Sequence, residues 1–145
     1  MLDLRGDKDA PVCVPANAER VALNFITRGC GVRIIASLGI RTTISALFSS
    51  HGKRDLAEAT VRDIGMAGLY RMIALHCGDE VKKSLALIAN PGNFPLVVHC
   101  IHGKDRTGVV VALVLLLCDV PAAEVLDDYA KSAPNLIEAK AKYGS

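Results

Sequence analysis

One continuous stretch, residues 96–108, most constrains what this chain can fold into. It opens with an apolar run, passes through His99 and Cys100 into a polar turn, and leads into an almost unbroken apolar segment over 109–117. Short β-branched runs favour strands and longer apolar runs favour buried helices, so we expect a strand, a loop and a helix. The backbone N–H groups of residues 101–107 would then converge at a helix N-terminus, where unpaired donors and the helix dipole favour a dianion. The sequence therefore predicts a phosphate-binding loop.

The side chains of this loop predict a nucleophile and its supports. Cys100 would lie at the base of the loop, where the same field lowers the thiol pKa and makes the sulfur a nucleophile. Arg106 would supply a planar fork that matches two phosphate oxygens, and Gly103 would let the backbone approach the anion closely. Thr107 would donate its hydroxyl to the sulfur, cap the helix, or do both. The alternative interpretation is a buried structural cysteine before a turn.

The string His99-Cys100-x-x-Gly103-Lys104-Asp105-Arg106-Thr107-Gly108 resembles the signature of the cysteine-dependent (Cys-x5-Arg) protein tyrosine and dual-specificity phosphatases. It is most similar to the atypical tyrosine/lipid phosphatase branch, whose loop carries Lys-Asp before the Arg. The resemblance extends over residues 38–132. It implies a hydrolase of phosphate monoesters that forms a phosphocysteine, with phosphotyrosine, phosphoserine or phosphothreonine in proteins, or phosphoinositides, as substrates.

The resemblance also implies a role for each loop residue. Catalytic roles fall to Cys100, Asp105, Arg106 and Thr107. Contacts with substrate fall to Ile101, His102, Gly103, Lys104 and Gly108. The remaining position, His99, is expected to hydrogen-bond the backbone near the cysteine and hold the loop in shape.

The general acid is a separate question, because expelling an alkoxide or phenolate requires a proton on the leaving oxygen. Asp105 is our candidate, since it lies in the loop beside Arg106 and a bound dianion would favour retention of its proton. The resemblance assigns the same role to this position. In the alternative interpretation Asp105 only shapes the loop, and Asp63 or Asp79 delivers the proton.

Two other functional classes fit parts of the pattern. A non-catalytic phosphate-binding module is favoured because the resembled branch continues its strand into an Asp-Leu-Arg segment, where this chain has Ser45-Ala46-Leu47-Phe48. It is also favoured because members of that branch run longer at both ends than this sequence. A sulfur transferase also places a cysteine on an anion loop after a strand, yet it has no use for the Asp-Arg-Thr-Gly tail. The combination of Cys100, Asp105 and Arg106 favours the hydrolase.

The fold class follows from the order of apolar segments. With 145 residues the chain suits one domain, and we expect an α/β three-layer sandwich: a small, largely parallel sheet flanked by helices, phosphatase-like, with the loop at the C-terminal end of a central strand. Residues 1–19 are charged and lack a period, which predicts a mobile N-terminal arm before a single phosphatase-like domain over 20–145. The expected elements are strands over 21–26 and 40–48, a break at 29–31, helices over 32–38, 65–77 and 122–131, a helix capped by Asp79, and a turn over 90–93.

Charge and hydropathy limit the partners. A net charge of +2 is too small to indicate a nucleic-acid partner. The longest apolar run, 109–118, is far short of a membrane span, so we expect at most peripheral membrane contact. The N-terminus does not resemble a secretory signal, which predicts a cytoplasmic protein. The sequence leaves the oligomeric state open.

The cysteines and histidines predict no metal and no cofactor. The five cysteines, at 13, 30, 77, 100 and 118, form no Cys-x-x-Cys pair, and their odd number predicts free thiols rather than a disulfide framework. Cys77 and Cys118 stand among apolar residues and are expected in the core. His51 and His76 lack metal-ligand spacing with any other donor.

Overall fold

The computed structural model describes residues 1–6, 14–25, 27–37, 53–132, 134 and 137. The chain groups into two compact units, of which the first combines Met1–Asn24 with Lys83–Ser145 and the second is Phe25–Lys82. The division therefore does not fall at residue 20, where the sequence separates a charged segment from a periodic one. The loop over 100–104 belongs to the first unit.

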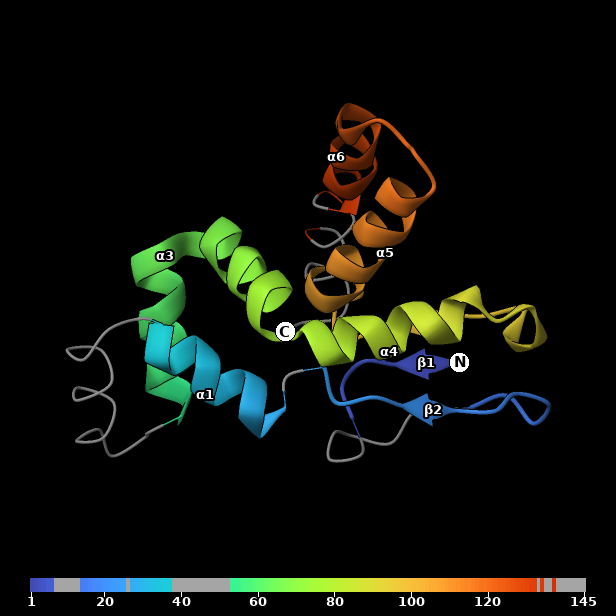
Figure 1. Cartoon of the computed structure of the whole chain (residues 1–145), viewed down its shortest axis with the longest axis horizontal. Helices are drawn as coiled ribbons and strands as arrows, with labels where there is room; N and C mark the ends of the chain where they lie inside the picture. Colours follow the sequence, from blue (N-terminus) through green and yellow to red (C-terminus); the bar gives the residue numbers. More distant parts are fainter. Residues whose placement is uncertain (7–13, 26, 38–52, 133, 135–136, 138–145) are drawn as a thin grey trace. The chain divides into compact units, whose positions relative to one another are not determined.

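The sheet of the first unit has its central strand at the start of the chain. β1 (Leu2–Asp3) lies between β2 (Val21–Ala22) and β3 (Val98–His99), and both neighbours run parallel to it. Figure 1 shows β1 and β2 as adjacent arrows. In this register Asp3 stands opposite His99. The small parallel sheet, together with the helices around it in sequence, confirms the predicted α/β class.

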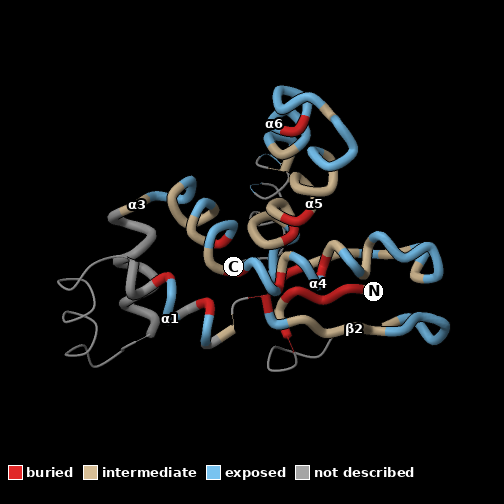
Figure 2. The backbone as a smooth tube through the Cα atoms, in the orientation of Figure 1, coloured by how far each residue is buried: buried red, intermediate tan, exposed pale blue. Residues whose placement is uncertain are grey.

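Residues 1–6 belong to the core, so the expectation of a mobile arm is wrong for this part of 1–19. Leu2, Asp3 and Leu4 are fully buried, and Figure 2 colours β1 as buried along its length. The backbone N–H groups of Leu2 and Leu4 donate to carbonyl oxygens of the β3 segment at 2.7 and 2.9 Å. The sequence cue failed because two alternating leucines are too few to establish a strand period before a charged run.

The helix after the loop starts earlier than its apolar run. α5 (Asp105–Leu117) begins at the charged end of the motif and packs on α6 (Ala122–Ala130). The contact is close at Gly108, where an added Cβ would lie 2.7 Å from the ring of Tyr129. Val110 of α5 is fully buried. Both helices agree with the segments predicted over 109–117 and 122–131.

α4 (Gly78–Ala89) begins in the second unit and ends in the first. The turn that follows agrees with the one predicted over 90–93. It is the short 3-10 helix η1 (Pro91–Asn93), and the Asn90 side chain accepts a hydrogen bond from the backbone N–H of Gly92 at 2.9 Å. The chain then enters β3 and the loop.

The second unit is built on α1 (Arg28–Ser37) and α3 (Lys53–His76). The sequence predicted a break at residues 29–31, but α1 is continuous there. The residues on either side of the two glycines are helical, and the helix runs through both glycines. α3 is interrupted at Gly65, whose φ of 67° lies in the left-handed region that glycine adopts without strain. The helix predicted over 65–77 corresponds to the second half of α3, which follows the interruption at Gly65. The strand expected over 40–48 lies outside the described residues.

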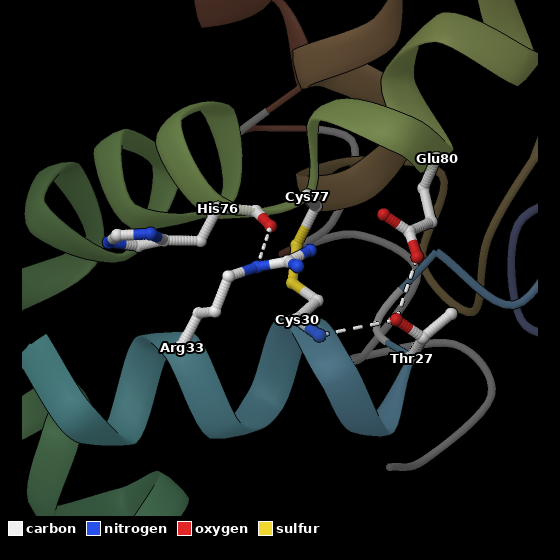
Figure 3. Close-up of a disulfide and its surroundings, with 6 residues drawn as sticks. All are labelled: Thr27, Cys30, Arg33, His76, Cys77 and Glu80. Atoms are coloured by element: carbon white, nitrogen blue, oxygen red, sulfur yellow. Dashed lines mark hydrogen bonds between the residues drawn. A yellow bond between two sulfur atoms is a disulfide. The ribbon is translucent and has the colours of Figure 1, made fainter.

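A disulfide joins Cys30 of α1 to Cys77, the residue between α3 and α4 (Figure 3). The expectation of free thiols is therefore wrong for this pair, because spacing rules carry no information about cysteines that are 47 residues apart in sequence. Cys77 is buried as expected, whereas Cys118 is free and exposed. Cys13 lies outside the described residues.

Hydrogen bonds surround this disulfide (Figure 3). The Thr27 hydroxyl donates to Glu80 Oε1 at 2.7 Å and accepts from the backbone N–H of Cys30 at 3.2 Å. Arg33 Nε donates to the carbonyl oxygen of His76 at 3.0 Å. These contacts tie α1 to the ends of α3 and α4 within the second unit.

None of the helices in the described part of the chain has both the length and the apolar character to cross a membrane.

Candidate active site

The loop between β3 and α5 lies at the carboxyl end of the parallel sheet, where open α/β folds bind anions. Its order of strand, loop and helix is the one predicted from the sequence. Gly103 has a φ of 63°, a left-handed conformation that turns the chain toward the helix N-terminus. The N–H of Gly108 donates to the carbonyl oxygen of Lys104 at 2.7 Å, which closes the first turn of α5.

Cys100 is buried at the base of this loop, with 6% of its surface exposed. Burial raises the pKa of its thiol, but hydrogen bonds from the Thr107 hydroxyl and from the backbone N–H groups of Thr107, His102 and Gly103 lower that pKa more. The net effect places the thiol pKa below its ordinary value. A lowered thiol pKa favours the thiolate, the form in which a cysteine can act as a nucleophile.

Thr107 lies in the first turn of α5. It is the third residue of α5 and is buried, so it lies inside the helix and not at its capping position. Its buried hydroxyl oxygen makes no hydrogen bond of ordinary geometry within the described residues, and the Thr107 side chain acts on Cys100 by lowering the pKa of the thiol. Thr107 is therefore not the N-cap of α5, and its expected role at the sulfur stays a prediction.

Arg106 is tied to the central strand of the sheet. Its Nη1 donates to the carbonyl oxygen of Leu4, just beyond β1, at 3.2 Å. A guanidinium carries five N–H donors in a rigid plane, so this bond orients the group while others can face an anion. The contact joins residues 102 positions apart in sequence, which is why sequence spacing could not reveal it.

The remaining loop side chains lie around this centre. Ile101 and His102 are exposed, as expected for positions that meet a substrate. Lys104 Nζ lies 5.7 Å from the centroid of the Tyr129 ring, a cation–π contact with α6. Asp105 is half-buried at the first position of α5.

Three aspartates were considered as the general acid. Asp105 belongs to the same compact unit as Cys100 and follows it by five residues. Asp79 stands in the first turn of α4 within the second unit, and Asp63 belongs to α3 of that unit. Asp105, at the first position of α5, is therefore the one of the three that directly follows the loop.

The Asp-Leu-Arg string that was sought at 45–48 occurs at the start of the chain. Asp3-Leu4-Arg5 stands at and just after β1, while residues 45–48 lie outside the described part. Sequence analysis missed it because the arm interpretation removed residues 1–19 from consideration. The literal string was the signal that could have found it.

Asp3 is the buried acid of this segment. Burial raises the pKa of its carboxyl, but hydrogen bonds from Arg5 and Arg20 and the charge of His99 hold that pKa well below its usual range. His99 Nδ1 lies 3.2 Å from the carbonyl oxygen of Cys100, the backbone contact expected of that histidine. Asp3 and His99 thus extend the candidate site into the sheet.

Comparisons with known proteins point to one family. A family model described as the tyrosine phosphatase family matches residues 1–144. A tyrosine-protein phosphatase from Nostoc commune is 40% identical over 58 residues, which is 40% of this chain and 20% of that protein. Inositol diphosphatase SIW14 from Saccharomyces cerevisiae is 29% identical over 70 residues, 48% of this chain and 25% of the relative. The triple specificity protein phosphatase PtpB from Mycobacterium tuberculosis is 27% identical over 96 residues, 64% of this chain and 35% of the relative.

The chain spans between a fifth and about a third of the length of these relatives. No solved structure matched. Within the described residues, no group of three or more histidine, cysteine or acidic side chains is placed to hold a metal ion.

Proposed function

We propose, given that this chain belongs to the tyrosine phosphatase family, that it hydrolyses phosphate monoesters through a phosphocysteine at Cys100. One observation carries the proposal. The buried Cys100 thiol has its pKa lowered by the loop N–H groups and by the Thr107 hydroxyl, at the N-terminal end of α5. A thiolate there meets the two needs of phosphoryl transfer, a nucleophile and donors for the phosphate oxygens.

The reaction would take two steps. In the first, the Cys100 thiolate attacks phosphorus, the bond to the leaving oxygen breaks, and Asp105 protonates that oxygen. In the second, water attacks the phosphocysteine and its proton returns to Asp105, while the sulfur leaves as a thiolate stabilised by Thr107. Arg106 would hold two equatorial oxygens throughout and bind them more strongly as they gain charge.

The names of the relatives and the charge of Lys104 support a choice of phosphorylated substrates. The names of the relatives point to phosphotyrosine, to several phosphorylated amino acids, and to inositol phosphates. We propose phosphotyrosine as the first substrate, with phosphoserine, phosphothreonine and phosphoinositides as alternatives that Lys104 would favour through its charge. Turnover of phosphotyrosine peptides beside a phosphoinositide panel tests this order. Faster turnover of the lipids would reverse it.

The non-catalytic module loses one of the two observations that favoured it. The Asp-Leu-Arg segment is present as Asp3-Leu4-Arg5, and the loop carries Cys100, Asp105 and Arg106 together. No feature of the described residues favours a sulfur transferase over the hydrolase.

Asp105→Asn tests the general acid. We expect this change to slow phenyl and alkyl phosphates by ~10²–10³-fold, because their leaving oxygens need a proton, and to spare a dinitrophenyl phosphate, whose leaving group does not. The basic limb of the pH–rate profile should disappear with the acid. Steady-state rates across such a leaving-group series measure the effect.

Asp63→Asn is the matched control for that series. It should leave the leaving-group dependence unchanged. If Asp63→Asn instead shows selective loss with poor leaving groups, and Asp105→Asn slows every substrate equally, the acid lies outside the loop.

Metal removal should leave the activity intact. The proposed chemistry uses a thiolate, an arginine and backbone donors, so a chelator at about 1 mM, enough to strip any ordinary divalent site, should not change kcat/KM. Rates before and after dialysis against the chelator measure this. Loss of activity that one divalent ion restores would contradict the mechanism.

A further inference from the structure

Asp3 is a charged side chain at the centre of the sheet, and its carboxylate is held firmly. It is fully buried, and a buried carboxylate is costly unless it is paired. The backbone N–H and Nε of Arg5 both donate to Asp3 Oδ1 at 3.0 Å, and Arg5 Nη2 donates to Oδ2 at 3.1 Å. Arg20 donates to Oδ2 from Nε at 3.1 Å and from Nη2 at 2.8 Å. These five bonds leave the carboxylate one orientation.

Arg20 also fixes the chain after β1. Its Nη2 donates to the carbonyl oxygen of Gly6 at 3.2 Å. Gly6 has a φ of 88°, and an added Cβ there would lie 2.8 Å from the Cβ of Asn24. The end of β1 is therefore held from both sides, and the Asp3 carboxylate is held with it.

The same carboxylate meets the residue that precedes the nucleophile. The β1–β3 register sets Asp3 opposite His99, and Asp3 Oδ1 lies 3.8 Å from His99 Nε2. That nitrogen is buried and has no hydrogen-bond partner in the described part of the chain, so the carboxylate is its charged neighbour. The other ring nitrogen, Nδ1, lies 3.2 Å from the carbonyl oxygen of Cys100. Because a carbonyl oxygen only accepts, this contact is a hydrogen bond when Nδ1 carries a proton.

The Cys100 carbonyl belongs to the first peptide plane of the loop. Since that plane is rigid, its orientation decides where the loop goes next. The following N–H groups, of His102 and Gly103, are the ones that donate to the Cys100 sulfur. At the other end of the loop, the Leu4 carbonyl, one residue after Asp3, holds Arg106. The end of β1 therefore contacts both ends of the loop.

We propose that Asp3 is a positioning residue for the Cys100 nucleophile. Its carboxylate holds the His99 ring in the orientation that fixes the Cys100 carbonyl, and this keeps the His102 and Gly103 N–H groups aimed at the sulfur. The inference rests on the proposed function, because it concerns the same nucleophile. The sequence motif around Cys100 does not include Asp3 and does not indicate this role for it.

Asp3→Asn tests the inference, because it keeps the size of the side chain and removes its charge. The readout is the pH dependence of Cys100 alkylation by iodoacetamide, followed by mass spectrometry of the peptide that contains Cys100. We expect the midpoint to rise by about one pH unit, so that alkylation at neutral pH slows by up to ~10-fold. With an aryl phosphate, kcat should fall while KM changes little.

The sign of the shift separates positioning from a direct field effect. Removing a nearby negative charge would by itself favour the thiolate and lower the midpoint. A lower or unchanged midpoint in Asp3→Asn would therefore overturn the inference. The other titratable or charged side chains near Cys100, on the loop and at the start of α5, are unchanged in Asp3→Asn. They are His102, Lys104, Asp105 and Arg106.

A double-mutant cycle with His99→Gln tests whether Asp3 acts through the histidine. His99→Gln alone should raise the midpoint, and adding Asp3→Asn should raise it no further. A second rise of similar size would overturn the inference. Asp128→Asn is the control for loss of one carboxylate, since Asp128 lies exposed on α6 beside Lys131, and it should leave the midpoint in place.

Asp3→Glu covers the case in which Asp3→Asn does not fold. It keeps the charge that Arg5 and Arg20 require and displaces the carboxylate by one methylene, so the midpoint should again rise. An unchanged midpoint would overturn the inference. Thiol titration needs no turnover, so a chain with a lowered thiol pKa but no phosphatase activity would contradict the proposed function alone.

Discussion

Cys100→Ser should abolish turnover, with a loss in kcat of ~10⁴-fold or more, because a serine hydroxyl in the same loop stays protonated at neutral pH. The thiol owes its reactivity to a pKa lowered by the loop donors, and a hydroxyl starts from a far higher value. Binding of inorganic phosphate should survive the change, since the N–H groups of the loop and Arg106 hold the anion. Steady-state kinetics with an aryl phosphate and calorimetry with phosphate measure the two effects.

Cys118→Ser is the matched control. Cys118 is a free cysteine at the end of α5, exposed and outside the loop, so its replacement should leave kcat unchanged. Substantial hydrolysis by Cys100→Ser would remove the covalent mechanism. Loss of phosphate binding in that variant would instead show that the sulfur holds the anion.

Arg106→Lys should cost ~10²–10³-fold in kcat/KM, because an ammonium cannot reproduce a planar fork whose bonds strengthen as the phosphate oxygens gain charge. The lysine would also lose the hydrogen bond to the Leu4 carbonyl that orients the guanidinium. The loss should appear mainly in kcat, since the interaction is stronger in the transition state than with bound substrate.

Arg71→Lys, on the exposed surface of α3, is the control for an arginine-to-lysine change and should leave kcat/KM unaltered. Near-native kcat/KM in Arg106→Lys would take Arg106 out of the site. An effect confined to KM would assign it to ground-state binding only.

The loop could be predicted because its determinants are local. A β-branched run, a cysteine, a glycine at positive φ and an apolar helix lie within about twenty consecutive residues, and each constrains its neighbours. Thr107 shows how far this goes. Its two possible roles follow from the sequence, whereas its place as the third residue of α5 and its burial are seen only in the structure.

The support of the loop could not be predicted because it comes from strand pairing. Asp3 and His99 are 96 positions apart in sequence, and only the β1–β3 register brings them together. A two-residue strand followed by charged residues carries almost no period, and the buried acid made the segment look like a solvated arm. The Cys30–Cys77 disulfide could not be predicted either, because it depends on how α1 packs against α3 and not on local sequence.

The most direct test of the account is to trap the covalent intermediate. The chain is mixed with an aryl phosphate, quenched in acid within the first turnovers, digested, and searched by mass spectrometry for a phosphorylated peptide. We expect a phosphate bonded to the Cys100 sulfur in the unaltered chain, longer-lived in Asp105→Asn with an activated substrate, and absent from Cys100→Ser. Hydrolysis without any phosphocysteine, or phosphate found on another residue, would contradict it.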